Sequence, residues 1–94
     1  MNVELISSSA VPKFERGVRL KHDRVRERHV VLGPEMLIEL NQTGTAIMSE
    51  IDGQSNLSEI VHRLAARFEV KPQDINQDVS EFCTTMVMRR VLHT

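Results

Sequence analysis

The 94 residues are enough for one domain, and a domain of this size has too small a core to enclose a deep active site. Twelve Lys and Arg residues nearly balance thirteen Asp and Glu residues, so no overall field attracts nucleic acid or an anionic membrane. The longest apolar run, Val30-Val31-Leu32, is too short to span a bilayer. No secretory signal opens the chain, and its single cysteine excludes an intrachain disulfide. These features predict a cytoplasmic protein.

The first eleven residues have no clear hydrophobic period and include Ser7-Ser8-Ser9-Ala10. We therefore predict a flexible N-terminal segment over residues 1–11 and a folded domain over residues 12–94. An alternative is that Leu5 and Ile6 dock on a neighbouring surface.

Three short strands are predicted next. Val18–Lys21 alternates apolar and basic residues, and His29–Leu32 is apolar and β-branched enough for a central strand. Gly33-Pro34-Glu35 forms a turn, after which Met36–Leu40 returns antiparallel. This last strand is a candidate edge, where another chain could pair. Met36 and Ile38 should face one way and Leu37 and Glu39 the other.

Three helices follow the strands. The first is predicted over Gln42–Asp52 with Asn41 as its N-cap, and the second over Leu57–Glu69 with Asn56 and Glu59 spaced as a capping box, Ser55 being a rival cap. The third opens at Pro72. The second helix should bury a stripe made of Leu57, Ile60, Val61, Leu64 and Phe68. Segregated strands and helices indicate an α+β fold, close to a winged helix-turn-helix, with a three-stranded antiparallel sheet followed by three helices.

Catalytic and metal-binding patterns are missing from the sequence. The four histidines form no His-x-x-x-His pair, and none is near Cys83. Cys83 falls on the apolar face of the third helix, where its pKa should not be lowered. Asp74 and Asp78, one turn apart, are best explained as solvated acids near the positive end of that helix. We therefore predict no enzyme activity, no metal and no cofactor.

Binding to DNA is the alternative function that the sequence leaves open. Winged helices often bind DNA, and Arg24, Arg26 and Arg28 cluster in one predicted loop. However, acidic residues lie among them, and the third helix begins with acids that would repel phosphate. A winged-helix DNA-binding regulator is therefore the second hypothesis.

A peptide-binding groove is the feature that remains. If the third helix packs beside the edge Met36–Leu40, its apolar stripe could form a wall along that edge, and a peptide could add as a further strand. The same stripe could equally be ordinary core, and its spacing alone favours core. The wall would consist of Val79, Phe82, Cys83 and Met86.

A family resemblance bears on this choice. It is carried by Pro12-Lys13-Phe14-Glu15-Arg16-Gly17-Val18-Arg19-Leu20, Val31-Leu32-Gly33-Pro34-Glu35, Leu40-Asn41, Ile51-Asp52-Gly53, Ile60-Val61 and Asp78-Val79-x-x-Phe82. In order and spacing these resemble the PqqD family, the small peptide chaperones of pyrroloquinoline quinone (PQQ) biosynthesis. The resemblance covers roughly residues 12–92. The chain departs from the family at Met36, where Gly is expected, and over residues 83–88, where more Leu is expected.

The resemblance implies a function. PqqD-like proteins are recognition elements for the leader peptides of ribosomally made, modified peptides. Their precursor peptide, PqqA, adds to the third strand, lies against the third helix and is presented to a radical S-adenosylmethionine enzyme, PqqE, which carries the iron–sulfur chemistry. Carried onto this chain, the strand is Met36–Leu40 and the helix Gln73–Arg90. The expected peptide-binding residues are Leu37, Ile38, Glu39 and Leu40 on the edge, with Leu40 alternatively pure core, and Val79, Phe82, Cys83 and Met86 on the wall.

The oligomeric state is open at this stage. Short strands and a loosely tethered N-terminus suit either a monomer or a homodimer that exchanges strands.

Overall fold

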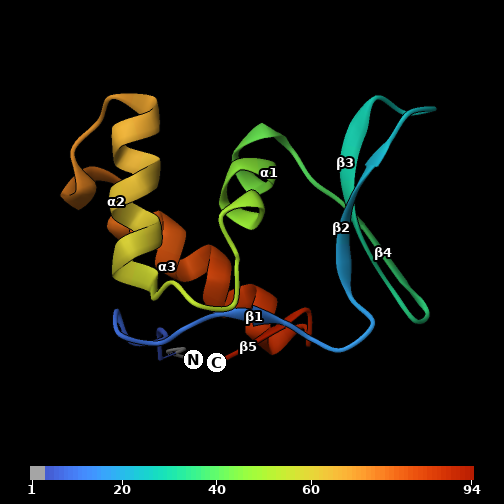
Figure 1. Ribbon diagram of the computed structural model, residues 1–94, viewed down its shortest axis with the longest axis horizontal. Helices are drawn as coiled ribbons and strands as arrows, with labels where there is room; N and C mark the ends of the chain where they lie inside the picture. Colours follow the sequence, from blue (N-terminus) through green and yellow to red (C-terminus); the bar gives the residue numbers. More distant parts are fainter. Residues whose placement is uncertain (1–3) are drawn as a thin grey trace.

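The structure is a computed structural model that describes residues 4–94, and it has an α+β fold with three helices and antiparallel sheets (Figure 1). The strands β2, β3 and β4 form one sheet in that order, and β1 pairs with β5 in a second, two-stranded sheet. In Figure 1 the larger sheet lies to one side of the helices, with α1 between it and α2 in this view. The elements in chain order are β1 (Lys13–Phe14), β2 (Arg19–Asp23), β3 (Arg28–Gly33), β4 (Met36–Glu39), α1 (Gln42–Ser49), α2 (Leu57–Phe68), α3 (Pro72–Met88) and β5 (Leu92–His93).

The three-stranded sheet presents one face to the hydrophobic core through the alternation of its side chains. Val31, which is fully buried, lies opposite Leu20 on β2 and Ile38 on β4, and these three face the hydrophobic core. Leu37 and Glu39 face the other way and are exposed. The predicted meander and the predicted facing of β4 are therefore confirmed. The β2–β3 hairpin is longer than predicted, because Asp23 and Arg28 still pair.

The helix starts agree with the local signals in the sequence. The Asn41 side chain accepts a hydrogen bond of 2.7 Å from the Gly44 backbone N–H, which caps α1. Asn56 and Glu59 form both hydrogen bonds of a capping box at the start of α2. Pro72 occupies the first turn of α3, where its missing N–H costs nothing. All three predicted starts are confirmed.

The predicted end of α1 at Asp52 is wrong, because the helix ends at Ser49. Backbone bonds from Glu50 to Ile47 and from Ile51 to Met48 tighten the last turn. The carboxylate of Asp52 then accepts hydrogen bonds from the N–H groups of Gln54 and Ser55, which turns the chain toward α2. These backbone hydrogen bonds lower the pKa of Asp52 to about 2.

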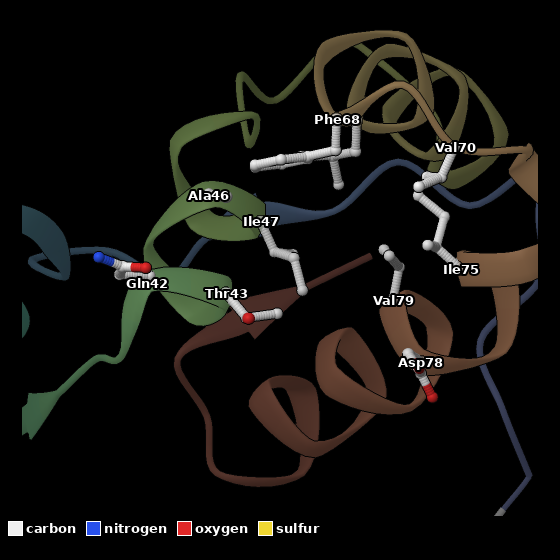
Figure 2. A pocket seen from close by; sticks show the side chains of 10 residues that line it. Gln42, Thr43, Ala46, Ile47, Phe68, Val70, Ile75, Asp78 and Val79 are labelled. Atoms are coloured by element: carbon white, nitrogen blue, oxygen red, sulfur yellow. The ribbon is translucent and has the colours of Figure 1, made fainter.

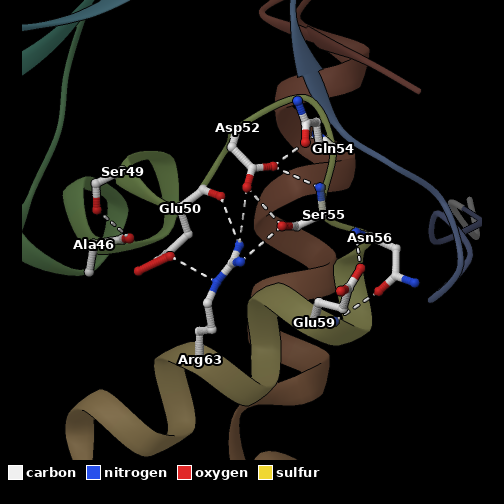
Figure 3. A network of polar contacts seen from close by, with 9 residues as sticks. All are labelled: Ala46, Ser49, Glu50, Asp52, Gln54, Ser55, Asn56, Glu59 and Arg63. Atoms are coloured by element: carbon white, nitrogen blue, oxygen red, sulfur yellow. Dashed lines mark hydrogen bonds and ion pairs between the residues drawn. The ribbon is translucent and has the colours of Figure 1, made fainter.

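Arg63 holds this turn against α2 (Figure 3). Its Nε lies 3.1 Å from Glu50 Oε2, and its Nη1 donates to Ser55 Oγ at 2.9 Å. Asp52 Oδ2 lies 3.8 Å from the same guanidinium. One side chain on α2 thus binds three residues of the α1–α2 connection, and this fixes how α1 sits on α2.

The first and last strands close the domain. Phe14 pairs with Leu92, and both Val91 and Leu92 are buried. This strand pairing was not predicted, because two residues carry no periodicity.

The N-terminal segment contacts the helices from Ile6 onward. The Ile6 N–H donates to Thr84 Oγ1 on α3 at 3.1 Å, and Ser8 and Ala10 accept hydrogen bonds from the first residues of α2. Ile6 also packs on the core while Leu5 is exposed. These contacts favour the alternative in which Ile6 docks. The predicted flexibility of residues 1–11 stays a prediction, and residues 1–3 lie outside the described residues. Over residues 4–94, no helix is long and apolar enough to cross a membrane.

Candidate functional site

The edge of β4 carries unpaired backbone groups. The Leu40 N–H donates to the His29 carbonyl at 3.0 Å, so the backbone of residue 40 faces β3. Because this facing alternates along an antiparallel pair, the N–H and C=O of Ile38 also face β3, and those of Leu37 and Glu39 face away. Among the described residues, β4 pairs with β3 alone. The edge therefore presents two donors and two acceptors.

The side chains of this edge differ in what they offer a ligand. Leu37 is 50% exposed, whereas Ile38 is partly buried against the core. Glu39 accepts a hydrogen bond from Arg26 at 2.6 Å and another from Arg28 at 2.9 Å. Two of the three arginines that could have formed a basic patch are thus paired with a carboxylate. This arrangement weakens the case for a phosphate-binding surface.

Leu40 is 8% exposed and belongs to the hydrophobic core. The alternative in which Leu40 is core therefore describes its side chain. Its backbone N–H pairs with His29 on β3 and adds nothing to the free edge.

The α3 residues predicted as a wall lie at different depths. Val79, Cys83 and Met86 are between 0% and 4% exposed and form part of the core. Burial raises the pKa of the Cys83 thiol to about 12, which leaves the thiol protonated and unreactive. Phe82 is only partly buried. In this conformation, Phe82 is the residue of the four with surface to offer, and the other three support it from beneath.

Phe82 also connects α3 to α1. A Cβ placed on Gly44 would lie 3.3 Å from two carbons of the Phe82 ring. The ring therefore rests against the first turn of α1, directly after the end of β4. Through this contact Phe82 joins α3 to the first turn of α1.

An apolar pocket lies beyond this contact, where the three helices meet (Figure 2). We call it the three-helix pocket; its volume is about 290 Å³. In Figure 2, Ile47, Val70 and Val79 extend toward the space beside the Phe68 ring. Its lining consists of Gln42, Thr43, Ala46 and Ile47 from α1, Leu64 and Phe68 from α2, Val70 from the connection, and Ile75, Asp78 and Val79 from α3.

Of the residues that line this pocket, sequence reasoning assigned only Val79 to a site, and it missed the two exposed apolar residues. Phe68 was predicted as part of the buried stripe of α2, but it is 53% exposed, and Val70 is 42% exposed. The prediction for Phe68 is wrong because α2 ends there: Glu69 has a positive φ of 56°, and the chain turns away. An aromatic residue in the last helical turn, followed by a second apolar residue, was the signal available in the sequence.

Within residues 4–94, no group of three His, Cys, Asp or Glu side chains is arranged to hold a metal ion. His22 and His29 lie opposite each other on β2 and β3, with ring centroids 4.9 Å apart.

Comparisons with known proteins give the family. A family model described as coenzyme PQQ synthesis protein D (PqqD) matches residues 28–92. The chain is 38% identical to the PqqA binding protein of Xanthomonas campestris pv. campestris strain 8004 over 87 residues, which is 93% of this chain and 95% of that protein. This chain belongs to the PqqD family. The resemblance noted in the sequence is therefore confirmed.

Further relatives of this PqqD-family chain include a fused protein and two solved structures. It is 35% identical to the bifunctional coenzyme PQQ synthesis protein C/D of Methylorubrum extorquens, over 92% of this chain and 23% of that protein. The solution structure of the PqqD truncation of Methylobacterium extorquens PqqCD, described as a functional and stand-alone RiPP recognition element, matches with a TM-score of 0.80, 34% identity and 94% coverage of both chains. The crystal structure of PqqD from Xanthomonas campestris matches with a TM-score of 0.60 and 37% identity, over 95% of this chain and 99% of that one.

Proposed function

We propose that this protein is a non-catalytic peptide chaperone of PQQ biosynthesis, which binds a PqqA-like precursor peptide as an added strand on β4. The observation that carries the proposal is the unpaired edge of β4, with the backbone groups of Leu37 and Glu39 directed away from β3. The names of its relatives support it: one is a PqqA binding protein, and another is described as a RiPP recognition element. These names give no support to the DNA-binding hypothesis.

The peptide-binding residues divide into three groups under this proposal. Leu37, Ile38 and Glu39 supply the edge, with Leu40 anchoring its end in the core. Phe82 supplies the exposed part of the wall. Val79, Cys83 and Met86 hold Phe82 in place from the core side.

Strand addition alone does not supply enough binding energy. Each backbone hydrogen bond contributes a net ~1 kcal/mol, so the four outward-facing groups of β4 contribute about 4 kcal/mol. Micromolar affinity requires about −8 kcal/mol, and ordering a flexible peptide adds a further cost. Apolar side chains of the peptide must therefore also be buried against the protein.

The remaining parts of the proposal extend what the family resemblance implies. The bound precursor is presented to a PqqE-like radical S-adenosylmethionine synthase, which performs the chemistry. The protein acts in the cytoplasm, where the ribosome releases the precursor. It acts as a monomer or as a strand-exchanged homodimer. The likeness of the fold to a winged helix also stays a prediction.

Titration of the ¹⁵N-labelled protein with a synthetic PqqA peptide tests the proposal. We expect amide signals to shift along Met36–Leu40 and Val79–Met86, because added hydrogen bonds and nearby side chains change the environment of those amides. A peptide of the same composition in scrambled order is the control. Shifts confined to other faces of the protein would contradict strand addition at β4.

A further inference from the structure

We propose that the three-helix pocket is a second subsite, which binds an apolar side chain from the part of the precursor peptide that extends beyond the segment paired with β4. The inference rests on the proposed function, because it takes the peptide on β4 as its starting point. It adds a specificity element that recognises a side chain, whereas the β4 edge recognises backbone.

The pocket continues the proposed peptide path. Gln42 and Thr43, which line it, follow β4 within four residues. On the other side, Val79 lines the pocket and lies one helical turn before Phe82. Gly44 follows Thr43 in the chain, and its contact with Phe82 joins α1 to α3. The pocket therefore adjoins, through Gln42 and Val79, the two elements to which the proposed function assigns the peptide.

The exposure of the pocket residues distinguishes it from ordinary core. Phe68 and Val70, at 53% and 42% exposed, are two of the large apolar side chains that this structure leaves in contact with water. Both border the same pocket, together with the partly buried Ile75. Water contact with several neighbouring apolar groups is unfavourable, so an apolar ligand that covers them gains affinity.

The size and polarity of the pocket define the ligand. A volume of about 290 Å³ lies at the lower limit of small-molecule sites, which suits a side chain better than a cofactor. Most of the lining is aliphatic or aromatic, and Asp78 supplies a carboxylate. That carboxylate disfavours an acidic side chain in the pocket. The three-helix pocket therefore best fits a neutral side chain of the peptide, either aliphatic or aromatic.

The substitutions Phe68→Ser and Val70→Ser test the pocket with little risk to folding, because both side chains are exposed. Val25→Ser is the matched control, since Val25 is a 94% exposed apolar residue in the β2–β3 connection. We expect calorimetry with a synthetic PqqA peptide to show a Kd raised by about fivefold in each pocket variant. The control should stay within about twofold of the unaltered protein.

A second measurement identifies the side chain that enters. Each apolar residue of the PqqA peptide is replaced by Ser in turn, and each peptide is titrated into the unaltered protein and the Phe68→Ser variant. One peptide position should weaken binding to the unaltered protein and have little effect on the variant, as expected for two groups in contact. In the unaltered protein, methyl signals of Ile47, Ile75 and Val79 should shift when peptide is added.

The outcomes separate the inference from the proposed function. Amide shifts along β4 with unchanged affinity in both pocket variants would overturn the inference alone. Failure of the peptide to bind the unaltered protein would overturn both. The protein could also prove to be a dimer that Phe68→Ser converts to a monomer while the peptide affinity stays unchanged. That result would show that the pocket binds a second copy of the chain, and it would overturn the inference.

Discussion

Phe82 lies against the backbone of Gly44, where a Cβ would come within 3.3 Å of the aromatic ring. Glycine at this position lets α1 and α3 approach closely, and the approach holds the ring against the first turn of α1. The partly exposed ring is therefore positioned by a contact between two helices.

Phe82→Asp should abolish detectable binding of a PqqA peptide, because a carboxylate would replace the apolar surface of the proposed wall. Calorimetry gives the affinity, and circular dichroism checks that the variant still folds. Thr85→Asp, at an exposed position of the same helix, introduces the same charge and should bind normally. Unchanged affinity in a folded Phe82→Asp protein would remove Phe82 from the proposed site.

Leu37→Pro should block peptide binding while it leaves the fold intact. The N–H of Leu37 faces away from β3, so proline there removes a donor from the free edge without breaking the β3–β4 ladder. Ile38→Pro is the contrasting control, because it removes an N–H that faces β3 and should lower the thermal midpoint. Peptide titrations and thermal melts of both variants distinguish the two effects. Normal binding by Leu37→Pro would argue against strand addition.

Glu39→Gln should lower the free energy of unfolding by at most about 1 kcal/mol. The carboxylate is paired with Arg26 and Arg28, but all three side chains are about half exposed, and water screens such pairs. Urea unfolding measures the change, and a double-mutant cycle with Arg28→Gln isolates that pair. The difference should shrink at high salt; a difference that is large and independent of salt would contradict this assignment.

Asp52 should make the stability of the protein depend on pH in acid. Its pKa falls from 3.8 to about 2 in the folded protein, so the unfolded state binds its proton first as pH decreases. The stabilisation is therefore complete above about pH 4 and is lost as the pH falls toward 2.

Comparing the unaltered protein with Asp52→Asn isolates this contribution from that of other carboxylates. The urea midpoints of the two proteins should differ at pH 7 and converge near pH 2. Because the carboxylate is exposed to solvent, the effect should be modest. A difference that stays constant between pH 7 and pH 2 would show that Asp52 acts through shape and not through its charge.

The features that the sequence predicted are those decided by neighbouring residues. Asn41, Asn56 and Pro72 start helices through bonds or geometry within one turn. The facing of β4 follows from a period of two. The pairing of β1 with β5 was missed because it depends on a contact between distant parts of the chain.

The candidate site shows the same division. Helical spacing correctly placed Val79, Phe82, Cys83 and Met86 on one face, but it could not say which of them other elements cover. Three are buried, and Phe82 keeps part of its surface although its ring rests against Gly44 of α1. Spacing likewise put Phe68 on the buried stripe of α2, although the helix ends there and leaves the ring beside the pocket.

The pairing of β1 with β5 has a consequence for how the protein is made. β1 leaves the ribosome first among the strands, but its partner is synthesised last of the described elements. The β2–β3–β4 sheet, by contrast, is formed from contiguous residues and can assemble early. During synthesis the β4 edge can therefore be complete while the domain is still open, so the growing chain needs to avoid pairing with other nascent strands before β5 emerges.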